Sequence, residues 1–233
     1  MPWRPTHAET HLSFRSNWLR AGVLGANDGI LSTSSLVLGV AASGASRSAI
    51  VTAGIAGLVA GAGSMAAGEY VSVSSQRDTE EADLTLERHE LATDPEGELR
   101  ELAGIYERRG LPQGLATEVA RSLTEHDVLE AHARDELGLP EERRANPLQA
   151  AGASALSFAV GAAVPLIAIA VFGHASRIAA CVVVTLLALG VLGGLGARLG
   201  GAPVGRAIGR VVFWGAVAMA VTSAVGTLVG TAV

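Results

Sequence analysis

The sequence contains no lysine and a single cysteine, and aromatic residues make up only 4% of its 233 residues. With Cys181 as the lone thiol, the chain can form no intrachain disulfide and no thiolate cluster, and Cys181 is expected to pack as a small apolar side chain. The motifs of a phosphate-binding loop, a serine nucleophile elbow and a zinc-protease histidine pair are also missing. These absences argue against the enzyme classes that such motifs define.

Apolar residues and glycine are abundant instead. Hydrophobic residues make up 49% of the chain, 29 residues are glycine, and the mean hydropathy is +0.40. Five stretches are long enough to cross about 30 Å of hydrocarbon at about 1.5 Å per residue. Residues 1–17 are polar and precede no cleavage site, so no removable signal peptide is expected. The composition therefore predicts an all-α integral membrane protein with spans at residues 18–42, 48–75, 148–172, 176–199 and 207–232.

Acidic residues are concentrated between the second and third predicted spans. Of 22 aspartates and glutamates, 19 lie between Asp78 and Glu142. Of the 17 arginines, 15 lie before the first span, in this insert, or between the fourth and fifth spans. The positive-inside rule then places the N-terminus and the insert in the cytoplasm and the C-terminus on the far side. The predicted organisation is a cytoplasmic segment 1–17, spans 18–75, a cytoplasmic helical domain 76–146 and spans 147–233.

Caps and helix breakers divide the insert into three helices. No glycine or proline interrupts residues 70–92, so the second span is expected to continue as a polar helix to about Thr93. A helix over 95–109 follows, because Asp94-Pro95 is suited to the N-cap and first turn. A third helix is predicted over 112–137. Three short helices bury little core, so packing on a partner chain would help this domain.

Two carboxylates, Asp28 and Glu69, are the only acids at predicted membrane depth. A charge at the centre of a spanning helix costs about 2.5 to 3.5 kcal/mol unless it faces a cavity or a partner. Met65 lies four residues before Glu69 and so shares a helix face with it. One soft and one hard ligand on a face suit a transition metal. The alternatives are that Asp28 is an interfacial residue at the cytoplasmic edge and that Met65 fills the core.

Six residues of the insert form a second candidate site. Two Glu-x-x-Glu pairs lie on successive helices, where a hairpin at Asp94-Pro95 could bring them together, and a histidine and a fifth glutamate are four apart on the third helix. Such a set suits divalent iron, manganese or zinc. Glu-x-x-Glu is also common on solvated helices, and the Glu-x-x-His signature of di-iron bundles is absent. The candidate ligands are Glu87, Glu90, Glu98, Glu101, His132 and Glu136.

Three segments resemble the vacuolar iron transporter family, which includes yeast and bacterial members. They are "LRAGVLGANDGILSTSSLVLGVA", "GSMAAGEYVSVSSQRD" and "ELGLPEERRANPLQAAGASALSFAVGAAVPL". The resemblance covers nearly the whole chain. It implies a dimer of five-span subunits, a pathway between the first and second spans at the two-fold axis, and a cytoplasmic three-helix metal-binding domain. It also implies export of ferrous iron, and often manganese, from the cytosol in exchange for protons.

The resemblance also assigns roles to residues. Asp28 and Met65 match the aspartate and methionine of the family's pathway, and Glu69 matches the glutamate that yeast and bacterial members carry where plant members have glycine. His132 and Ala133 depart from the pattern, because plant members have two methionines there. The ligand set of the insert is therefore harder than theirs. The five glutamates that match the plant domain's ligands are Glu87, Glu90, Glu98, Glu101 and Glu136.

The function predicted from these observations is proton-coupled transport of divalent metal out of the cytosol, with Fe²⁺ as the first substrate and Mn²⁺ as the second. Zn²⁺ is a further candidate for binding to the insert. No enzyme activity, cofactor or nucleic-acid partner is expected, and the partners are a second copy of the chain, the lipid bilayer, metal ions and protons. The lysine-free, alanine-rich composition favours a bacterial plasma membrane. The alternatives are a membrane-anchored ferroxidase and a metal sensor that does not transport.

Overall fold

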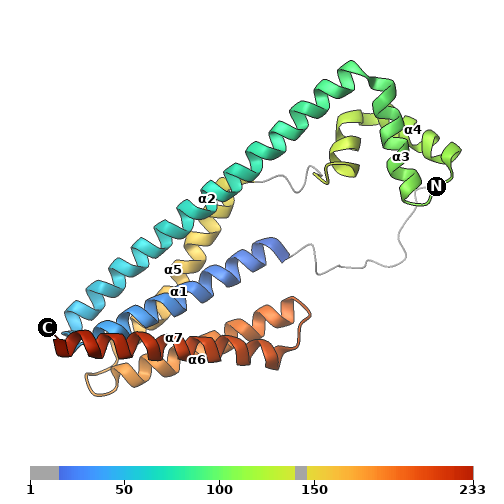
Figure 1. The fold of residues 1–233 in the computed structure, drawn as a ribbon. Helices are drawn as coiled ribbons and strands as arrows, with labels where there is room; N and C mark the ends of the chain where they lie inside the picture. Colours follow the sequence, from blue (N-terminus) through green and yellow to red (C-terminus); the bar gives the residue numbers. More distant parts are fainter. Residues whose placement is uncertain (1–15, 140–145, 233) are drawn as a thin grey trace. The chain divides into compact units, whose positions relative to one another are not determined.

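The computed structural model describes residues 16–139 and 146–232 (Figure 1). Within these residues all regular structure is helical, with seven α-helices and no strand. The expected all-α class is therefore confirmed, and most of the expected segment 1–17 lies outside the described residues. In chain order the helices are α1 Ser16–Ala42, α2 Arg47–Thr93, α3 Pro95–Arg108, α4 Gln113–Asp135, α5 Pro147–Val171, α6 Arg177–Leu199 and α7 Val204–Ala232.

Five of these helices are long and apolar enough to cross a membrane: α1 from Gly22, α2, α5, α6 and α7. The predicted number and order of spans are confirmed. Large apolar side chains such as Leu187 and Phe213 are exposed on the spans, as expected where lipid covers a protein surface. With 47 residues, α2 has a length of about 70 Å at about 1.5 Å per residue. Only its apolar first part fits a bilayer, and its charged second part lies outside.

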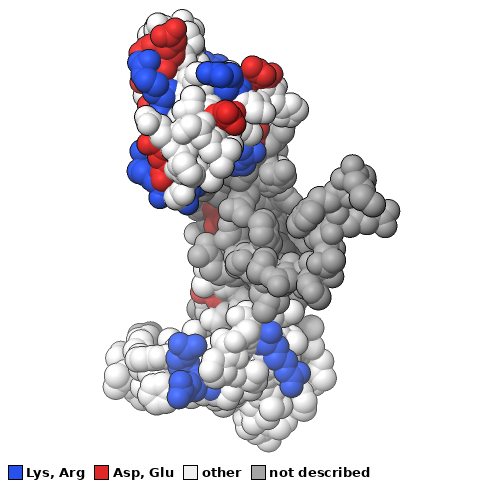
Figure 2. Space-filling model, turned by 90° about the vertical axis from the view of Figure 1, so that its right-hand side faces the viewer, with Lys and Arg blue, Asp and Glu red and all other residues white. Residues whose placement is uncertain are grey.

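The chain forms two compact units. Among the described residues one, here called the membrane unit, comprises residues 16–69 and 148–232, and the other, the polar unit, comprises residues 70–139, 146 and 147. Figure 2 shows Asp, Glu and Arg side chains gathered over one part of the surface, whereas another described part is nearly free of acids and carries a few arginines. The helix α2 contributes its first part to the membrane unit and its second part to the polar unit.

Glycines allow the helices of the membrane unit to approach closely. A Cβ atom at Gly29 of α1 would collide with the backbone at Phe158 of α5, and a Cβ at Gly161 of α5 would collide with the backbone at Ala26 of α1. Small residues allow such backbone contact between spans. α1 therefore lies directly against α5 on both sides of the Asn27-Asp28 pair, which lies between these contacts. Cys181 packs in the core, as expected, and is fully buried.

Within the polar unit α2 ends at Thr93, the residue at which the sequence predicts that end. Asp94 caps α3 by accepting a hydrogen bond from the Gly97 backbone N–H at 2.9 Å, and Pro95 occupies the first turn, as predicted. α3 and α4 pack together. Their core is small, in agreement with the expectation for three short helices, and consists of Leu102, Ala103, Ile105, Ala120 and Ala131.

The structure corrects the prediction of one uninterrupted helix over 112–137. Asp127 inside α4 has extended dihedral angles, φ −160° and ψ 98°. Its Oδ1 accepts a hydrogen bond from the Glu130 backbone N–H at 2.9 Å, as an N-cap residue does. Asp127 and Glu130 have the spacing of a capping box, so the signal for a new helix start is present in the sequence. The result is a separate short helical segment over residues 128–135.

A cluster of hydrogen bonds around Asp135, absent from the sequence predictions, fastens this segment to α3. The Tyr106 hydroxyl donates to Oδ2 at 2.7 Å, Arg109 Nη1 donates to Oδ1 at 2.8 Å, and Arg134 Nη2 donates to Oδ2 at 2.8 Å. Burial alone would raise the pKa of Asp135, but the bonds from Arg134, Arg109 and Tyr106 outweigh it and lower the pKa from 3.8 to about 2. These bonds hold the ionised carboxylate in place.

Replacing Asp135 with asparagine is expected to loosen the 128–135 segment. The Asp135 side chain is only 9% exposed, and its lowered pKa corresponds to about 2 kcal/mol of stabilisation. That stabilisation is complete above pH 4 and is lost as the pH falls from about 4 towards the folded-state pKa of about 2. Hydrogen exchange of the full-length protein at neutral pH should become faster in residues 128–139. The exposed Glu125→Gln on the same helix is the control, and equal exchange in both variants would contradict the prediction.

Candidate metal sites

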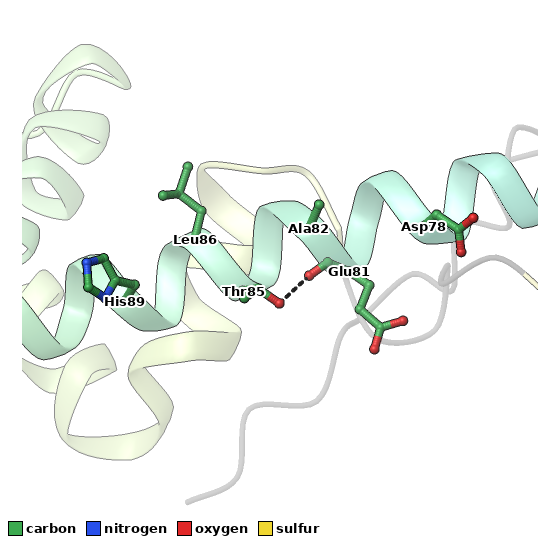
Figure 3. Close-up of a pocket in the computed structure, with 6 residues that line it drawn as sticks. All are labelled: Asp78, Glu81, Ala82, Thr85, Leu86 and His89. Atoms are coloured by element: carbon green, nitrogen blue, oxygen red, sulfur yellow. Dashed lines mark hydrogen bonds between the residues drawn. The ribbon is translucent and has the colours of Figure 1, made fainter.

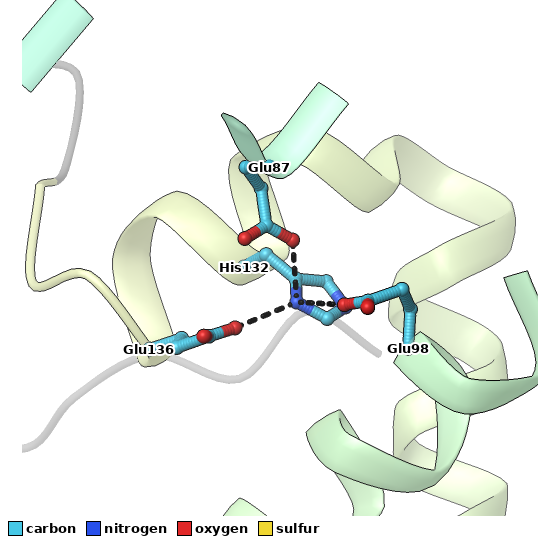
Figure 4. Close-up of side chains that lie close together, drawn as sticks. All are labelled: Glu87, Glu98, His132 and Glu136. Carbon is cyan, nitrogen blue, oxygen red and sulfur yellow. Dashed lines mark hydrogen bonds and ion pairs between the residues drawn. The ribbon is translucent and has the colours of Figure 1, made fainter. Parts of the chain in front are cut away.

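Four side chains from three helices of the polar unit converge in what we call the glutamate–histidine cluster. Glu87 comes from the polar part of α2, Glu98 from α3, His132 from α4, and Glu136 from the residue that caps α4 (Figure 4). One ligand atom of each lies within 4.8 Å of the others. The packing of the three helices therefore brings together donors that are up to 49 residues apart in the sequence.

Two of the distances in the glutamate–histidine cluster are close to those between ligands that share an ion, and the third is a few tenths of an ångström longer. His132 Nδ1 lies 2.9 Å from Glu87 Oε1, 2.9 Å from Glu136 Oε2 and 3.7 Å from Glu98 Oε2. One ring nitrogen carries at most one hydrogen, so it can bond well to only one of these three oxygens. Ligands about 2.1 Å from a metal are separated by about 3.0 Å in an octahedral site and about 3.4 Å in a tetrahedral one. A divalent cation would satisfy all four groups together.

Burial makes the unpaired polar atoms of these groups unfavourable for stability. Glu87 is 2% exposed and His132 is fully buried. Glu87 Oε1, whose contact with Nδ1 has an ion-pair distance without hydrogen-bond geometry, and His132 Nε2 have no hydrogen-bond partner among the described residues. A buried polar atom left unpaired costs about 1 to 3 kcal/mol. The glutamate–histidine cluster is thus less favourable for stability alone than an apolar core would be.

Glu87 and Glu98 resist ionisation in the metal-free protein. Burial raises the pKa of Glu87 to about 7, and although His132 lowers it, the charges of Glu136, Glu98 and Glu90 raise it further. Burial also raises the pKa of Glu98, again opposed by His132 and reinforced by Glu101, Glu90 and Glu136. Protons and metal ions therefore compete for the same oxygens.

Metal binding at the cluster is expected to strengthen as the pH rises through 7. Below the Glu87 pKa of about 7 a metal ion must displace a proton, which lowers affinity by up to about tenfold per pH unit. The stability of the metal-free fold changes in the opposite direction and falls as the pH rises. The loss occurs between pH 4.5 and about 7, because the Glu87 carboxyl ionises there in the unfolded chain but not in the folded one. Calorimetric titration of Mn²⁺ into the full-length protein at pH 6, 7 and 8 measures the trend, and an affinity independent of pH would contradict it.

Two of the six residues predicted as ligands in the polar unit lie outside the glutamate–histidine cluster. Glu90 and Glu101 are exposed and are not members of the converging group. Their charges nevertheless reach it, because Glu90 raises the pKa of Glu87 and both raise the pKa of Glu98. Ala133, where the resemblance implies a ligand in other members, is fully buried and provides no ligand atom.

A shallow groove beside the polar part of α2 brings no such groups together. It is lined by Asp78, Glu81, Ala82, Thr85, Leu86 and His89, all from this one helix (Figure 3). The Thr85 hydroxyl is occupied by the main-chain oxygen of Glu81, to which it donates at 2.7 Å. The two carboxylates and the imidazole are spread along the helix, so the groove has no convergent donors.

The membrane unit has a cavity of about 220 Å³ that brings two of the predicted pathway residues together. Asp28 of α1 and Met65 of α2 both line it. Glu69, the third predicted pathway residue, lies one turn beyond Met65, half-buried, and is not among the lining residues. We call this space the Asp28–Met65 cavity. Its walls are Asp28, Ser32, Thr33, Leu36, Gly57, Gly61, Ser64, Met65 and Phe158.

Five spans, a cavity with a carboxylate and a thioether, and a polar unit with clustered carboxylates and an imidazole define a multi-span membrane protein whose donor groups suit divalent metals. The chain belongs to the VIT family, whose sequence model matches residues 19–227. The resemblance seen in the sequence is confirmed. The family is one of transporters, in agreement with the expectation that the chain is not an enzyme.

The similarity to named relatives extends over most of each protein. A vacuolar iron transporter of Acanthamoeba castellanii is 46% identical over 214 residues, which cover 91% of this chain and 79% of the relative. Vacuolar iron transporter homolog 2 of Arabidopsis thaliana is 41% identical over 94% of this chain and 87% of its own length. Vacuolar iron transporter homolog 5 of Oryza sativa subsp. japonica is 43% identical over 92% and 81% respectively.

Proposed function

We propose that this protein transports Fe²⁺ out of the cytosol in exchange for protons, with Mn²⁺ as a second substrate. The observation that carries the proposal is its identity of 41 to 46%, over more than nine-tenths of the chain, with relatives named for iron transport. The geometry supports a location for the metal in the membrane unit. A cavity at membrane depth contains a carboxylate and a thioether, a ligand pair suited to a transition metal.

In the proposed mechanism the glutamate–histidine cluster collects M²⁺ on the cytosolic side and raises its local concentration. The ion then passes along α2 by way of Glu69 to Met65, which lies one turn further into the membrane unit. Asp28 binds the metal ion and the proton in turn, and this exchange couples the two fluxes. A carboxylate suits this step because it is the one cavity-lining group that is a strong ligand when ionised and neutral when protonated.

We propose that the protein acts as a homodimer through the exposed face of α2. Of the five spans, α2 is the least buried by its own chain. Its exposed positions include the small residues Ala56, Ala60, Gly63 and Ala67, and a Cβ at Gly63 would meet nothing within 4 Å. Large apolar side chains are exposed on the spans too, Leu187 and Phe213 on α6 and α7 and Ile55 and Val59 on α2. Small residues on an unpaired face suit packing between helices better than contact with lipid.

The proposed orientation places the polar unit in the cytoplasm and the C-terminus on the far side. Its support is the arginine distribution, because 15 of the 17 arginines lie in segments that the predicted topology places on the cytoplasmic side of the membrane. The composition favours a bacterial plasma membrane, where the activity is efflux, whereas the relatives are named for the vacuole. Both locations require transport away from the cytosol.

Transport by the purified protein in liposomes, with a pH-sensitive dye inside, tests this function. Fe²⁺, Mn²⁺, Zn²⁺ and Co²⁺ are compared under an imposed pH gradient, with protein-free liposomes as the control. Fe²⁺ uptake with opposite proton movement, followed by slower Mn²⁺ uptake, is expected. Oxygen consumption without metal movement would instead indicate a ferroxidase, and metal binding without either would indicate a sensor.

A further inference from the structure

Three hydroxyl groups line the Asp28–Met65 cavity beside the two predicted pathway residues: those of Ser32, Thr33 and Ser64. Ser32 lies one turn after Asp28 on α1, and its hydroxyl donates to the main-chain oxygen of Asp28 at 2.6 Å. Ser64 precedes Met65 on α2. The polar surface of the cavity thus consists of one carboxylate, one thioether and neutral oxygens.

Thr33 is a buried hydroxyl residue on the cavity wall. Hydroxyls in helices usually donate to a carbonyl three or four residues earlier, as Ser34 and Thr222 do here. Thr33 is only 2% exposed, and its Oγ1 has no hydrogen-bond partner among the described residues. In the same part of the chain, the Oγ atom of Ser35 and the Oγ1 atom of Thr185 are also buried without a partner, but neither residue lines the cavity. A buried unpaired hydroxyl is unfavourable for folding. Its place on the cavity wall points to a role in binding what enters the cavity.

Apolar side chains and glycines make up most of the remaining cavity wall. Leu36 and the Phe158 ring lie against Gly57 and Gly61 of α2, where an added Cβ would collide with them. The cavity volume of about 220 Å³ accommodates a metal ion with several waters, since each water occupies about 30 Å³.

We propose that Thr33 is a specificity-determining residue of the transport site. Its hydroxyl oxygen, with that of Ser64, replaces part of the hydration shell of a divalent cation held by Asp28 and Met65. This inference rests on the proposed function. The neutral oxygens make the ligand set harder than a carboxylate and a thioether alone. They therefore favour Mn²⁺, which depends more on oxygen ligands, relative to softer ions.

Thr33→Val tests the assignment, because it replaces the hydroxyl with a methyl group of similar size. In liposomes its KM for Mn²⁺ is expected to rise about tenfold, and its KM for Fe²⁺ less, since a hydrogen-bonding oxygen facing a charge is lost. Thr33→Ser keeps the oxygen and should stay near the wild-type values. Thr185→Val is the matched control, because Thr185 is a fully buried threonine of α6 that does not line the cavity.

Thermal stability distinguishes a functional hydroxyl from a structural one. Thr33→Val removes an unpaired buried group, so its melting temperature should equal or exceed that of the wild type while its transport is weaker. Unchanged KM values for both metals, or an equal effect of Thr185→Val, would overturn the role of Thr33 and leave the proposed function intact. A wild type that moves no metal would instead overturn the proposed function and this assignment with it.

Discussion

Replacing Asp28 with asparagine or alanine is expected to reduce Fe²⁺ transport at least about 100-fold, while the protein stays folded. Among the residues that the structure describes, Asp28 is the only ionisable group lining the Asp28–Met65 cavity, so no described neighbour there can replace its charge. Loss of one charged ligand in such a place costs roughly 3 kcal/mol of binding, which corresponds to about 100-fold. The variant should be no less stable, because a carboxylate at membrane depth is itself unfavourable.

Initial rates of Fe²⁺ uptake into liposomes measure this effect. Asp28→Glu keeps the charge and should retain part of the activity. Asp78→Asn removes an exposed carboxylate from the polar part of α2 and should transport like the wild type. Size-exclusion chromatography in detergent checks that each variant is folded. A folded Asp28→Ala protein with full activity would remove Asp28 from the mechanism.

Glu87→Gln is expected to weaken metal binding to the polar unit at least about tenfold, whereas Glu90→Gln weakens it much less. Both glutamates match ligands of the family's domain by resemblance, but only Glu87 belongs to the converging group. Glu87 is buried and lies 2.9 Å from His132 Nδ1, whereas Glu90 is exposed. A lost ligand costs more than about 1.4 kcal/mol, or tenfold, whereas an exposed charge acts through solvent and is screened by salt.

Calorimetric titration of Mn²⁺ into the full-length variants, at low and at high salt, separates the two effects. The loss in Glu87→Gln should persist at high salt, and the small loss in Glu90→Gln should disappear. Transport should slow only partly in either variant, and in the double variant Glu87→Ala with Glu90→Ala, since the polar unit collects metal but does not form the membrane pathway. Equal loss of affinity in both single variants would show that the two glutamates are equivalent ligands.

Local signals in the sequence predict the helices well. The spans follow from apolar length, which is decisive because a lipid-exposed backbone must satisfy its own hydrogen bonds. The end of α2 at Thr93 and the start of α3 follow from Asp94 and Pro95, which act within one turn. The break at Asp127 has a comparable signal, the Asp-x-x-Glu spacing to Glu130. A search for capping boxes within predicted helices would find it.

The sites depend on packing, which spacing does not determine. Glu87 and Glu90 are three residues apart and share a helix face, as Glu98 and Glu101 do. The spacing predicts four equivalent carboxylates, yet α4 packs so that only one of each pair converges on His132. The hydrogen bonds of Asp135 with Tyr106 and Arg109 join residues that are 29 and 26 positions apart, respectively. No local pattern marks such pairs.

The Asp28–Met65 cavity shows the same division between local and long-range information. Its acid and thioether stand out in the sequence because such groups are rare at membrane depth. Thr33 does not stand out, because serine and threonine are ordinary in spans, where they bond to their own helix. Only the structure shows that this hydroxyl is buried, unpaired and on the cavity wall.

Simultaneous recording of Fe²⁺ and proton flux in liposomes tests the central claim most directly. In the wild-type protein, protons should move down their imposed gradient while Fe²⁺ moves in the opposite direction, in a fixed ratio. Asp28→Asn should abolish both fluxes together. Fe²⁺ uptake by the wild type that is indifferent to the pH gradient, or loss of one flux without the other in Asp28→Asn, would contradict the account.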